Sequence, residues 1–326
     1  MAVTPHYEDD ALRGEFNDEG KMNLRGVVPV LATPFHADAS IDESFLRRQI
    51  DFCSASGVAR LCAPAFGSEY YKLSDSERRR VAEIVVQHAN HRVPILVNVG
   101  APGIQATVEF SRHAESLGAD GIMVAAPRVV PLGGAELMIF FEEVSRSVKI
   151  PVMLQDADFQ GGGLPVRISI ELAERCPNLQ FVKLENVQPG ERRREIIRQS
   201  NGKIQVFYGW GGVRLFDGLA HGACGIMPGP ALSGIFVHIF KPYDPGRVDE
   251  AKACFYRLLP FLVFALEHLE LLIRMEKRVL MRQGVIASDR LREPTLRLDT
   301  AYQQQVEELV TQVLALMAEL PEVSPL

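Results

Sequence analysis

From about residue 26, the chain alternates short apolar runs with longer segments in which apolar residues recur at a helical period. The runs are continuously apolar, which is typical of strands buried on both faces of a parallel sheet. Eight such runs are present, at residues 27–32, 59–63, 94–99, 121–125, 151–155, 180–183, 204–208 and 224–227. The pattern therefore predicts eight strands, with a helix between each one and the next.

The segments between the runs carry the signals of amphipathic helices. They cover residues 42–56, 74–90, 103–117, 134–147, 166–175, 189–199 and 212–221. Ser74-Asp75-Ser76-Glu77 has the sequence of a capping box, and Asp42 stands where a helix N-cap would stand. Gly57, Gly118 and Gly222 follow three of the segments, and glycine commonly ends a helix in the left-handed conformation.

Eight strand–helix units predict a (β/α)8 barrel, an α/β fold that typically needs about 250 residues. A doubly wound open sheet is the rival architecture, but no GxGxxG motif follows the first strand. Beyond about residue 236 the strand pattern stops, and residues 247–283 and 300–320 are rich in helical periodicity. We therefore predict an N-terminal arm, a barrel and a small C-terminal helical region, at residues 1–22, 23–235 and 236–326.

Composition narrows the classes of function. The 326 residues are 47% hydrophobic and 23% charged, with a net charge of −6 and a pI near 5.8. This balance argues against nucleic acid or an anionic membrane as a partner. Five scattered cysteines suggest neither a disulfide framework nor a zinc site. The polar N-terminus does not have the pattern of a signal peptide, so we expect a cytoplasmic protein. No Asp, Glu and His triplet has the spacing of metal ligands, so we expect neither a metal nor a cofactor.

Lys183 is the first candidate for chemistry. It ends the apolar run at residues 180–183, and lysine is rarely buried unless it is paired or functional. Burial favours the neutral amine, which attacks carbonyl groups. At the C-terminal end of a barrel strand, where active sites form, Lys183 would be a Schiff-base nucleophile. The alternative is a structural lysine whose stem packs while its ammonium group reaches water.

The sequence also resembles a known superfamily, the class I aldolases and lyases that include dihydrodipicolinate synthase and N-acetylneuraminate lyase. The resemblance covers roughly residues 24–320 and rests on the order and spacing of short motifs. They are Thr33-Pro34-Phe35, Gly67-Ser68-Glu69-Tyr70, Gly118-Ala119-Asp120-Gly121, Pro151-Val152-Met153-Leu154, Val182-Lys183 and Gly222-Ala223-Cys224-Gly225-Ile226. It implies that Lys183 forms an imine with C2 of a 2-oxo acid, and that the protein is a homotetramer.

The fifth predicted strand departs from the common family pattern. Most members have a tyrosine there as an acid/base group, whereas this chain has Gln155. Glutamine can only orient groups by hydrogen bonds, so condensation of the dihydrodipicolinate synthase type is a weaker alternative. Gln155-Asp156-Ala157, together with the segment at residues 277–294, resembles the 2-keto-3-deoxy-L-arabonate dehydratase branch. This narrower resemblance implies dehydration of a 2-keto-3-deoxy sugar acid.

Other candidates lie at the predicted strand ends. We assign Ser68, Glu69 and Gln155 to catalysis with Lys183, although Glu69 and Gln155 also suit structural roles. The candidates for substrate binding are Gly67, Ser68, Tyr70, Asn98, Trp210 and Gly211. Ser68 and neighbouring backbone amides would bind the substrate carboxylate. Tyr70 could instead lie in an interface, and Trp210 could instead pack in the core.

Two other functions remain open. A retro-aldolase would use the same lysine and imine to release pyruvate from a 2-keto-3-deoxy acid. Loss of the tyrosine would also suit a non-catalytic sensor of 2-oxo acids built on an aldolase barrel. Free pyruvate as a product would indicate cleavage, whereas retention of all carbons would indicate dehydration.

Overall fold

The computed structural model describes residues 24–127, 129–158, 163–186, 189–240 and 248–320. The predicted arm at residues 1–22 lies outside them. Within these ranges a parallel sheet has the strand order β1-β8-β7-β6-β5-β4-β3-β2. The strands are β1 (Gly26–Val27), β2 (Leu61–Cys62), β3 (Ile95–Asn98), β4 (Gly121–Ala125), β5 (Val152–Asp156), β6 (Leu179–Leu184), β7 (Gln205–Tyr208) and β8 (Gly225–Ile226).

The sheet closes on itself. Gly26 pairs with Gly225 between β1 and β8, and a parallel bridge joins Val30 to Cys62, beyond β1 and at the end of β2. Each strand from β1 to β7 is followed by a helix before the next strand, so the predicted (β/α)8 barrel is confirmed. The predicted first strand, 27–32, is too long because it includes Pro29, which has no N–H to donate to a ladder.

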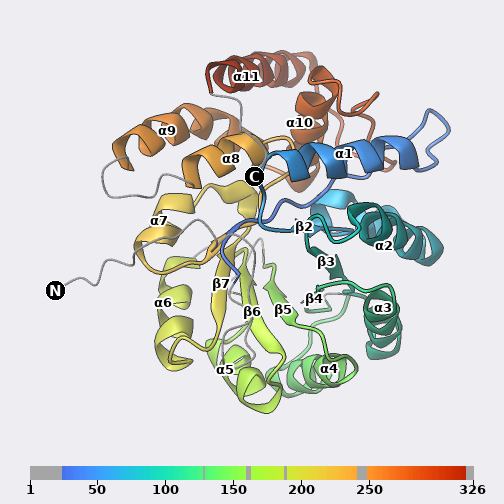
Figure 1. Ribbon diagram of the computed structural model, residues 1–326, viewed down its shortest axis with the longest axis vertical. Coiled ribbons are helices and arrows are strands. Elements are labelled where there is room, and N and C mark those ends of the chain that lie inside the picture. The colour runs from blue at the N-terminus through green and yellow to red at the C-terminus, as the bar shows by residue number, and fades with distance from the viewer. Residues whose placement is uncertain (1–23, 128, 159–162, 187–188, 241–247, 321–326) are drawn as a thin grey trace.

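Helices surround the strands (Figure 1). The barrel helices are α1 (Glu43–Ala55), α2 (Asp75–Ala89), α3 (Ile104–Ser116), α4 (Gly134–Arg146), α5 (Val166–Arg175), α6 (Pro189–Gln199), α7 (Leu215–Ala220) and α8 (Ser233–Phe240). The capping predictions are confirmed, since Asp42 caps α1 and Ser74 forms a capping box with Glu77 on α2. The seventh helix begins later than predicted because Gly211 and Gly212 have positive φ angles of 58° and 82°.

Three further helices follow the barrel: α9 (Val248–Ala265), α10 (Leu269–Arg282) and α11 (Thr300–Glu319). In Figure 1 they lie together beside α8 and α1. The boundary we predict between residues 235 and 236 falls inside α8, the helix that follows β8. None of the described helices is long and apolar enough to cross a membrane.

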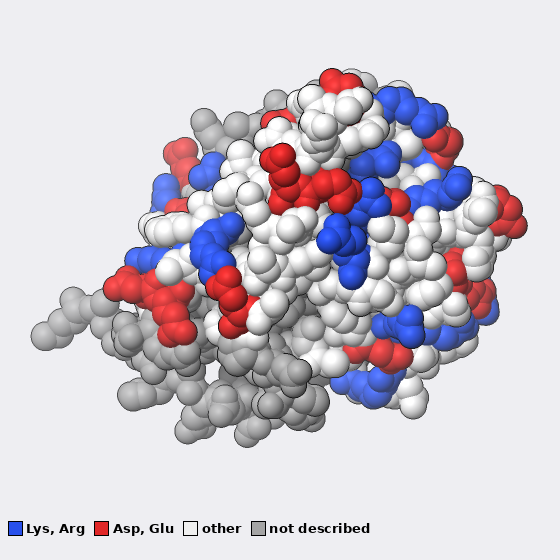
Figure 2. All heavy atoms as spheres, turned by 90° about the horizontal axis from the view of Figure 1, so that it is seen from above, with Lys and Arg blue, Asp and Glu red and all other residues white. Residues whose placement is uncertain are grey.

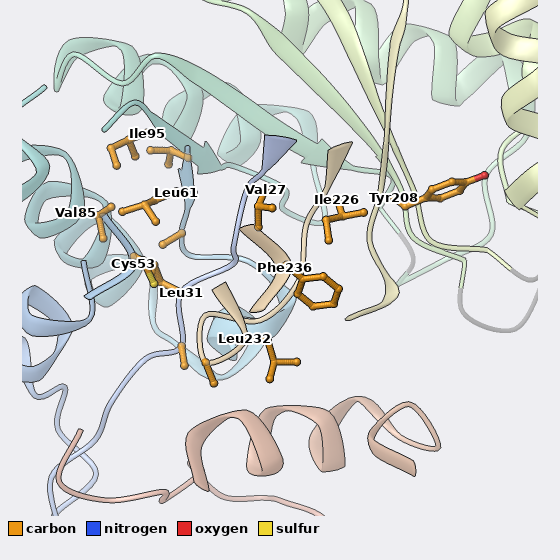
Figure 3. Packing of buried hydrophobic residues seen from close by; sticks show 14 of the residues in the cluster. Val27, Leu31, Cys53, Leu61, Val85, Ile95, Tyr208, Ile226, Leu232 and Phe236 are labelled. Carbon is orange, nitrogen blue, oxygen red and sulfur yellow. The ribbon is translucent and has the colours of Figure 1, made fainter. Parts of the chain in front are cut away.

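The core has two parts. A smaller group of side chains fills the barrel interior, including Leu96, Met123, Met153, Phe181 and Phe207. A larger group lies between the strands and the surrounding helices. Figure 3 shows its members from five elements, namely Val27, Cys53, Leu61, Ile226 and Phe236.

The surface in Figure 2 mixes charges of both signs. On the face shown, Lys and Arg side chains are interspersed with Asp and Glu side chains across the coloured area. This distribution fits the small net charge of −6 and offers no extended basic face there for a polyanion.

Candidate active site

Strand alternation directs Lys183 into the barrel. Successive side chains of a strand point to opposite faces, and Phe181, two residues before Lys183, belongs to the barrel interior. Lys183 therefore points inward as well, one layer nearer the C-terminal end, and its side chain is 3% exposed. Glu185, another two residues on, is also buried.

Lys183 forms an ion pair with Glu185. The distance from Lys183 Nζ to Glu185 Oε1 is 3.1 Å. On the neighbouring strand, Gln155 Nε2 donates a hydrogen bond of 2.5 Å to Glu185 Oε2. Gln155 and Lys183 are register partners between β5 and β6, which explains why the amide and the amine meet the same carboxylate. The result is a buried lysine beside a group that can accept or return a proton.

The end of β7 fixes the Glu185 carboxylate. The Trp210 backbone N–H donates to Glu185 Oε1 at 3.2 Å. A Cβ atom at Gly209 would lie 2.1 Å from the same oxygen, so only glycine leaves room for the carboxylate. Trp210 itself has a positive φ of 51°, which non-glycine residues adopt rarely. This turn, η4 (Trp210–Gly212), thus shapes the position of the Glu185 carboxylate.

A cavity of about 390 Å³ opens above Lys183 and Glu185. Its walls come from the C-terminal ends of several strands and from the start of α10. The lining residues are Val30, Ala32, Phe66, Gly67, Lys183, Glu185, Trp210, Gly211, Met227, Pro228, Gly229, Pro230, Leu266, Glu267, His268, Leu269, Leu272, Ile273 and Glu276. This is the end of a barrel at which catalytic sites form. Of the residues predicted from sequence, Lys183, Gly67, Trp210 and Gly211 line the cavity.

Ser68 and Gln155 lie beside the cavity rather than in its described lining. The Ser68 hydroxyl donates to the Leu31 carbonyl at 2.5 Å and accepts from Ala65 N–H at 2.9 Å. Both hydrogen bonds fasten the turn η2 (Phe66–Ser68), so Ser68 shapes this turn instead of presenting its hydroxyl to the cavity. Gln155 binds Glu185 and is therefore a positioning residue.

The catalytic assignment of Glu69 does not fit its surroundings. Glu69 is fully buried and receives Lys277 Nζ at 2.5 Å and Lys72 Nζ at 3.2 Å. The Arg292 backbone N–H also donates to it, at 3.0 Å. Because both carboxylate oxygens are bound by cations or amides, Glu69 joins the loop after β2 to the C-terminal region. These contacts favour a structural role for Glu69 over a catalytic one.

Tyr70 and Asn98 also lie outside the described cavity lining. Tyr70 packs edge-on against Phe66, with ring centroids 5.2 Å apart, and the Arg78 guanidinium lies 5.0 Å from its ring. Burial raises the pKa of the Tyr70 phenol, so it is a weak acid. Asn98 ends β3 and is buried, and its Nδ2 has no hydrogen-bond partner among the described residues.

Three carboxyl residues line the cavity without being among the predicted site residues, namely Glu185, Glu267 and Glu276. Glu185 could have been found from the sequence, because strand alternation from Lys183 places it on the same face. Glu276 comes from α10, in the C-terminal region, so no rule about barrel strand ends identifies it. Burial raises the pKa of Glu276 to about 8.

The Cys62 thiol and the potential metal ligands near the barrel offer no second reactive centre among the described residues. Burial raises the pKa of the Cys62 thiol to about 12, which removes it as a nucleophile near neutral pH. Within the described ranges, no three His, Cys, Asp or Glu side chains come together to hold a metal ion. Lys183 is thus the candidate nucleophile among the described residues that line the cavity.

A closed (β/α)8 barrel with a buried lysine and carboxylate at its mouth has the architecture of a barrel enzyme. Comparison with known proteins narrows that class, because the model of the dihydrodipicolinate synthetase family matches residues 23–313. The chain belongs to this family and is a lyase. L-2-keto-3-deoxyarabonate dehydratase of Azospirillum brasilense is 29% identical over 274 residues, or 83% of this chain and 88% of that protein.

A second relative is YagE of Escherichia coli K12, whose proposed activity is that of a 2-dehydro-3-deoxy-D-gluconate aldolase. It is 27% identical over 294 residues, which are 88% of this chain and 96% of that protein. Its crystal structure in complex with pyruvate superposes with a TM-score of 0.81, covering 90% of this chain and 98% of that one at 26% identity.

A third comparison concerns the fold alone. The 4-hydroxy-tetrahydrodipicolinate synthase of Methylacidiphilum fumariolicum SolV has a TM-score of 0.84 and 18% identity, covering 91% of this chain and 98% of that one.

Proposed function

We propose that the protein dehydrates a 2-keto-3-deoxy sugar acid through an imine on Lys183. The observation that carries this proposal is the buried contact of Lys183 with Glu185, 3.1 Å apart at the base of the cavity. A nucleophile and a proton acceptor within such reach are the parts that covalent acid–base catalysis requires. The dehydratase of Azospirillum brasilense supports this reaction.

The proposed dehydration needs no cofactor. Lys183 Nζ attacks C2, the carbonyl oxygen leaves as water, and a protonated imine forms. A base removes a proton from C3, and the electron pair forms the C2–C3 double bond of an enamine. The enamine then expels the C4 hydroxyl group, which leaves as water after taking up a proton. Hydrolysis of the resulting unsaturated imine releases the product and restores Lys183.

Glu185 suits both proton transfers. Its carboxylate can accept the C3 proton and return that proton to the leaving hydroxyl, so one group serves two steps on the same side of the imine. Gln155 holds Oε2, and the Trp210 N–H holds Oε1. We assign the substrate carboxylate to the turn at Phe66 and Gly67, both of which line the cavity.

Retro-aldol cleavage is the second candidate. It uses the same imine but breaks the C3–C4 bond, with a base removing the proton of the C4 hydroxyl and pyruvate as one product. The complex of the Escherichia coli relative with pyruvate favours this reaction. The two candidates therefore differ in products and not in the nucleophile.

Borohydride trapping tests the shared premise. The protein is reduced in the presence of pyruvate or a 2-keto-3-deoxy acid, and the modified residue is located by mass spectrometry. We expect an adduct on Lys183 that disappears in Lys183→Ala and persists in Lys203→Ala, a matched change at an exposed lysine. Equal trapping by Lys183→Ala would refute the imine.

Product analysis then separates the reactions. A panel of five- and six-carbon 2-keto-3-deoxy acids is incubated with the enzyme, and pyruvate is measured in parallel with total carbon. Dehydration predicts a product that keeps every carbon and no free pyruvate. Trapping without turnover of any acid in the panel would favour a sensor of 2-oxo acids.

We also propose that the chain forms a homotetramer in the cytoplasm. The family resemblance supports the tetramer, and the five free cysteines suit the reducing environment of the cytoplasm. Sedimentation velocity at micromolar concentration tests the first, with a single species of four chains expected. Fractionation of the source cells tests the second.

A further inference from the structure

Glu276 is a carboxyl group in an otherwise apolar face of α10. Leu269, Leu272, Ile273 and Glu276 all line the cavity, and their spacing of three, four and seven residues places them on one side of the helix. A helix packed over a barrel mouth for stability alone would present an apolar residue at the fourth position. Among these described residues, Glu276 is therefore the one polar residue on this face of α10, and it is directed at the cavity.

The surroundings of Glu276 leave one of its oxygens unbound. Oε2 accepts a hydrogen bond of 2.9 Å from the Ala231 backbone N–H. Oε1 is buried and has no hydrogen-bond partner among the residues that the structure describes. The side chain is 3% exposed. A buried polar atom without a partner costs free energy, which a ligand in the cavity would offset by binding it.

The loop after β8 leaves space for the Glu276 carboxyl group. A Cβ atom at Gly229 would lie 2.1 Å from the Glu276 carboxyl carbon and 2.4 Å from each oxygen. Only glycine therefore lets the carboxyl reach its position at the cavity wall. The neighbouring Lys277, in contrast, is fully paired with Glu69 and the Arg290 carbonyl on another side of the helix. Of these two buried α10 residues, Glu276 is therefore the one that keeps an oxygen without a hydrogen-bond partner among the described residues.

We propose that Glu276 is the specificity-determining residue for the distal end of the substrate, where it binds a hydroxyl group through its free oxygen. This inference rests on the proposed function, because it takes the 2-oxo end to be held on Lys183. The group recognised is a neutral alcohol of a polyhydroxy chain, not a second carboxylate or a phosphate.

The charges of the cavity support a neutral tail. Lys183 is the only Lys or Arg among the described residues that line it, whereas Glu185, Glu267 and Glu276 are carboxyls. Among the described lining residues, a distal anion would find no ammonium or guanidinium group beyond that of Lys183. The raised pKa of Glu276, about 8 because of burial, leaves the carboxyl protonated at neutral pH, so it can both donate to and accept from an alcohol.

The order of the strands in the sheet defines a route for the substrate from Lys183 to Glu276. Lys183 stands on β6, Trp210 and Gly211 follow β7, and Gly229 follows β8 beneath Glu276. Since β6, β7 and β8 are consecutive in the sheet, a chain anchored at Lys183 reaches Glu276 by crossing the end of β7. All of these residues line the same cavity.

The test compares two acids of equal chain length. Borohydride trapping on Lys183 is measured at subsaturating concentration for 2-oxopentanoate and for a five-carbon 2-keto-3-deoxy acid, in the wild type, Glu276→Leu and Glu276→Gln. Leucine fills the volume without polar atoms, whereas glutamine keeps both hydrogen-bonding functions. We expect Glu276→Leu to lower the preference for the hydroxylated acid by about 10- to 100-fold, and Glu276→Gln to retain it within a few-fold.

The outcomes distinguish this inference from the proposed function. An unchanged preference in Glu276→Leu, with adducts still formed by both acids, would overturn the role of Glu276 and leave the imine intact. Absence of any Lys183 adduct in the wild type would overturn the imine and the inference with it. Equal loss of preference in the glutamine and leucine variants would also count against hydrogen bonding as the cause.

Discussion

Glu185 is held beside Lys183 from three directions, by the lysine itself, by Gln155 and by the Trp210 backbone. Such a fixed carboxylate is suited to general acid–base catalysis, where geometry matters as much as proton affinity. Replacing it with glutamine keeps an acceptor for the Trp210 N–H but removes the ionisable carboxylate that we propose to exchange protons.

We therefore expect Glu185→Gln to separate imine formation from turnover. The variant should still give a borohydride adduct with pyruvate on Lys183, while kcat for the keto-deoxy acid falls by about 10²- to 10⁴-fold. Mass spectrometry and steady-state kinetics measure the two effects. Glu174→Gln, at an exposed carboxyl on α5, serves as the control and should match the wild type. Turnover within a few-fold of wild type would show that another group moves the proton.

The buried carboxyl of Glu276 predicts how stability depends on pH. Its pKa is raised from 4.5 to about 8, so between these values the folded protein keeps a proton that the unfolded chain has lost. Stability from this group is therefore lost progressively as pH rises through that window, by up to a few kcal/mol. The Cys53 thiol nearby, with a pKa near 12, does not titrate there.

Glu276→Gln should remove that dependence. We expect the variant to gain Tm over the wild type at pH 8.5 and to differ little at pH 5, because glutamine carries no charge at either value. Thermal melts followed by circular dichroism across this range provide the measurement. A gain that is the same at both pH values would contradict a buried titrating carboxyl.

At the residue scale, the sequence was sufficient to place Lys183 at the cavity and insufficient to identify its neighbours. Lys183 could be found because an ammonium group ending an apolar run is chemically conspicuous. The contacts of Glu69 favour its structural alternative, and the sequence could not show them because one partner, Lys277, lies on a helix about 200 residues away. Contacts of that range arise from tertiary packing, which local sequence does not encode.

At the element scale, α10 is bound to the barrel by the ion pair between Glu69 and Lys277. Both side chains are fully buried, and the nitrogen and oxygen are 2.5 Å apart. Removing one partner of a buried pair leaves the other charge uncompensated, which is much more costly than losing a pair at the surface.

Glu69→Gln should therefore destabilise the protein by about 3–5 kcal/mol. Chemical denaturation monitored by circular dichroism gives the free energy of unfolding. The matched control is Glu319→Gln, which breaks the exposed pair with Arg257 and should shift the midpoint too little to resolve. Similar midpoints for the two variants would mean that the buried pair adds no more than the exposed one.

Element positions were predictable wherever local signals decided them. The helices α1 and α2 begin where their caps indicate, because Asp42 and Ser74 bind the first backbone N–H groups of each helix. The end of β7 was harder to predict. Its left-handed residues, Trp210, Gly211 and Gly212, delay the start of the helix from the predicted residue 212 to Leu215. Tertiary contacts with Glu185 and the α9–α10 region hold this turn.

At the scale of the whole molecule, the C-terminal helices complete the barrel mouth. The walls of the cavity come from strand ends on one side and from the start of α10 on the other. Eight strand–helix repeats could be read from the sequence because the period of the pattern is local. The docking of α9 to α11 could not, since their apolar faces do not specify which barrel face they cover.

Substitution of Phe236 on α8 tests the packing between the barrel and the C-terminal helices. It is fully buried, and a Cβ atom at Gly212 would lie 2.7 Å from its ring; Figure 3 shows it near Ile226. We expect Phe236→Ala to cost about 3–5 kcal/mol through the cavity that it leaves. Val263→Ala, at a side chain 60% exposed, should cost little. Urea denaturation compares them, and equal midpoints would contradict the expected cost of the cavity.

Trp210 lies between two hollows, the 390 Å³ cavity above Lys183 and a second of about 370 Å³ on the side of Val213 and Val263. It is the only tryptophan in the chain. Its indole emission is therefore an intrinsic optical reporter placed at the site itself, requiring no label. Titration with a 2-oxo acid should quench or shift that emission with a saturating dependence on concentration, and Lys183→Ala should weaken the response.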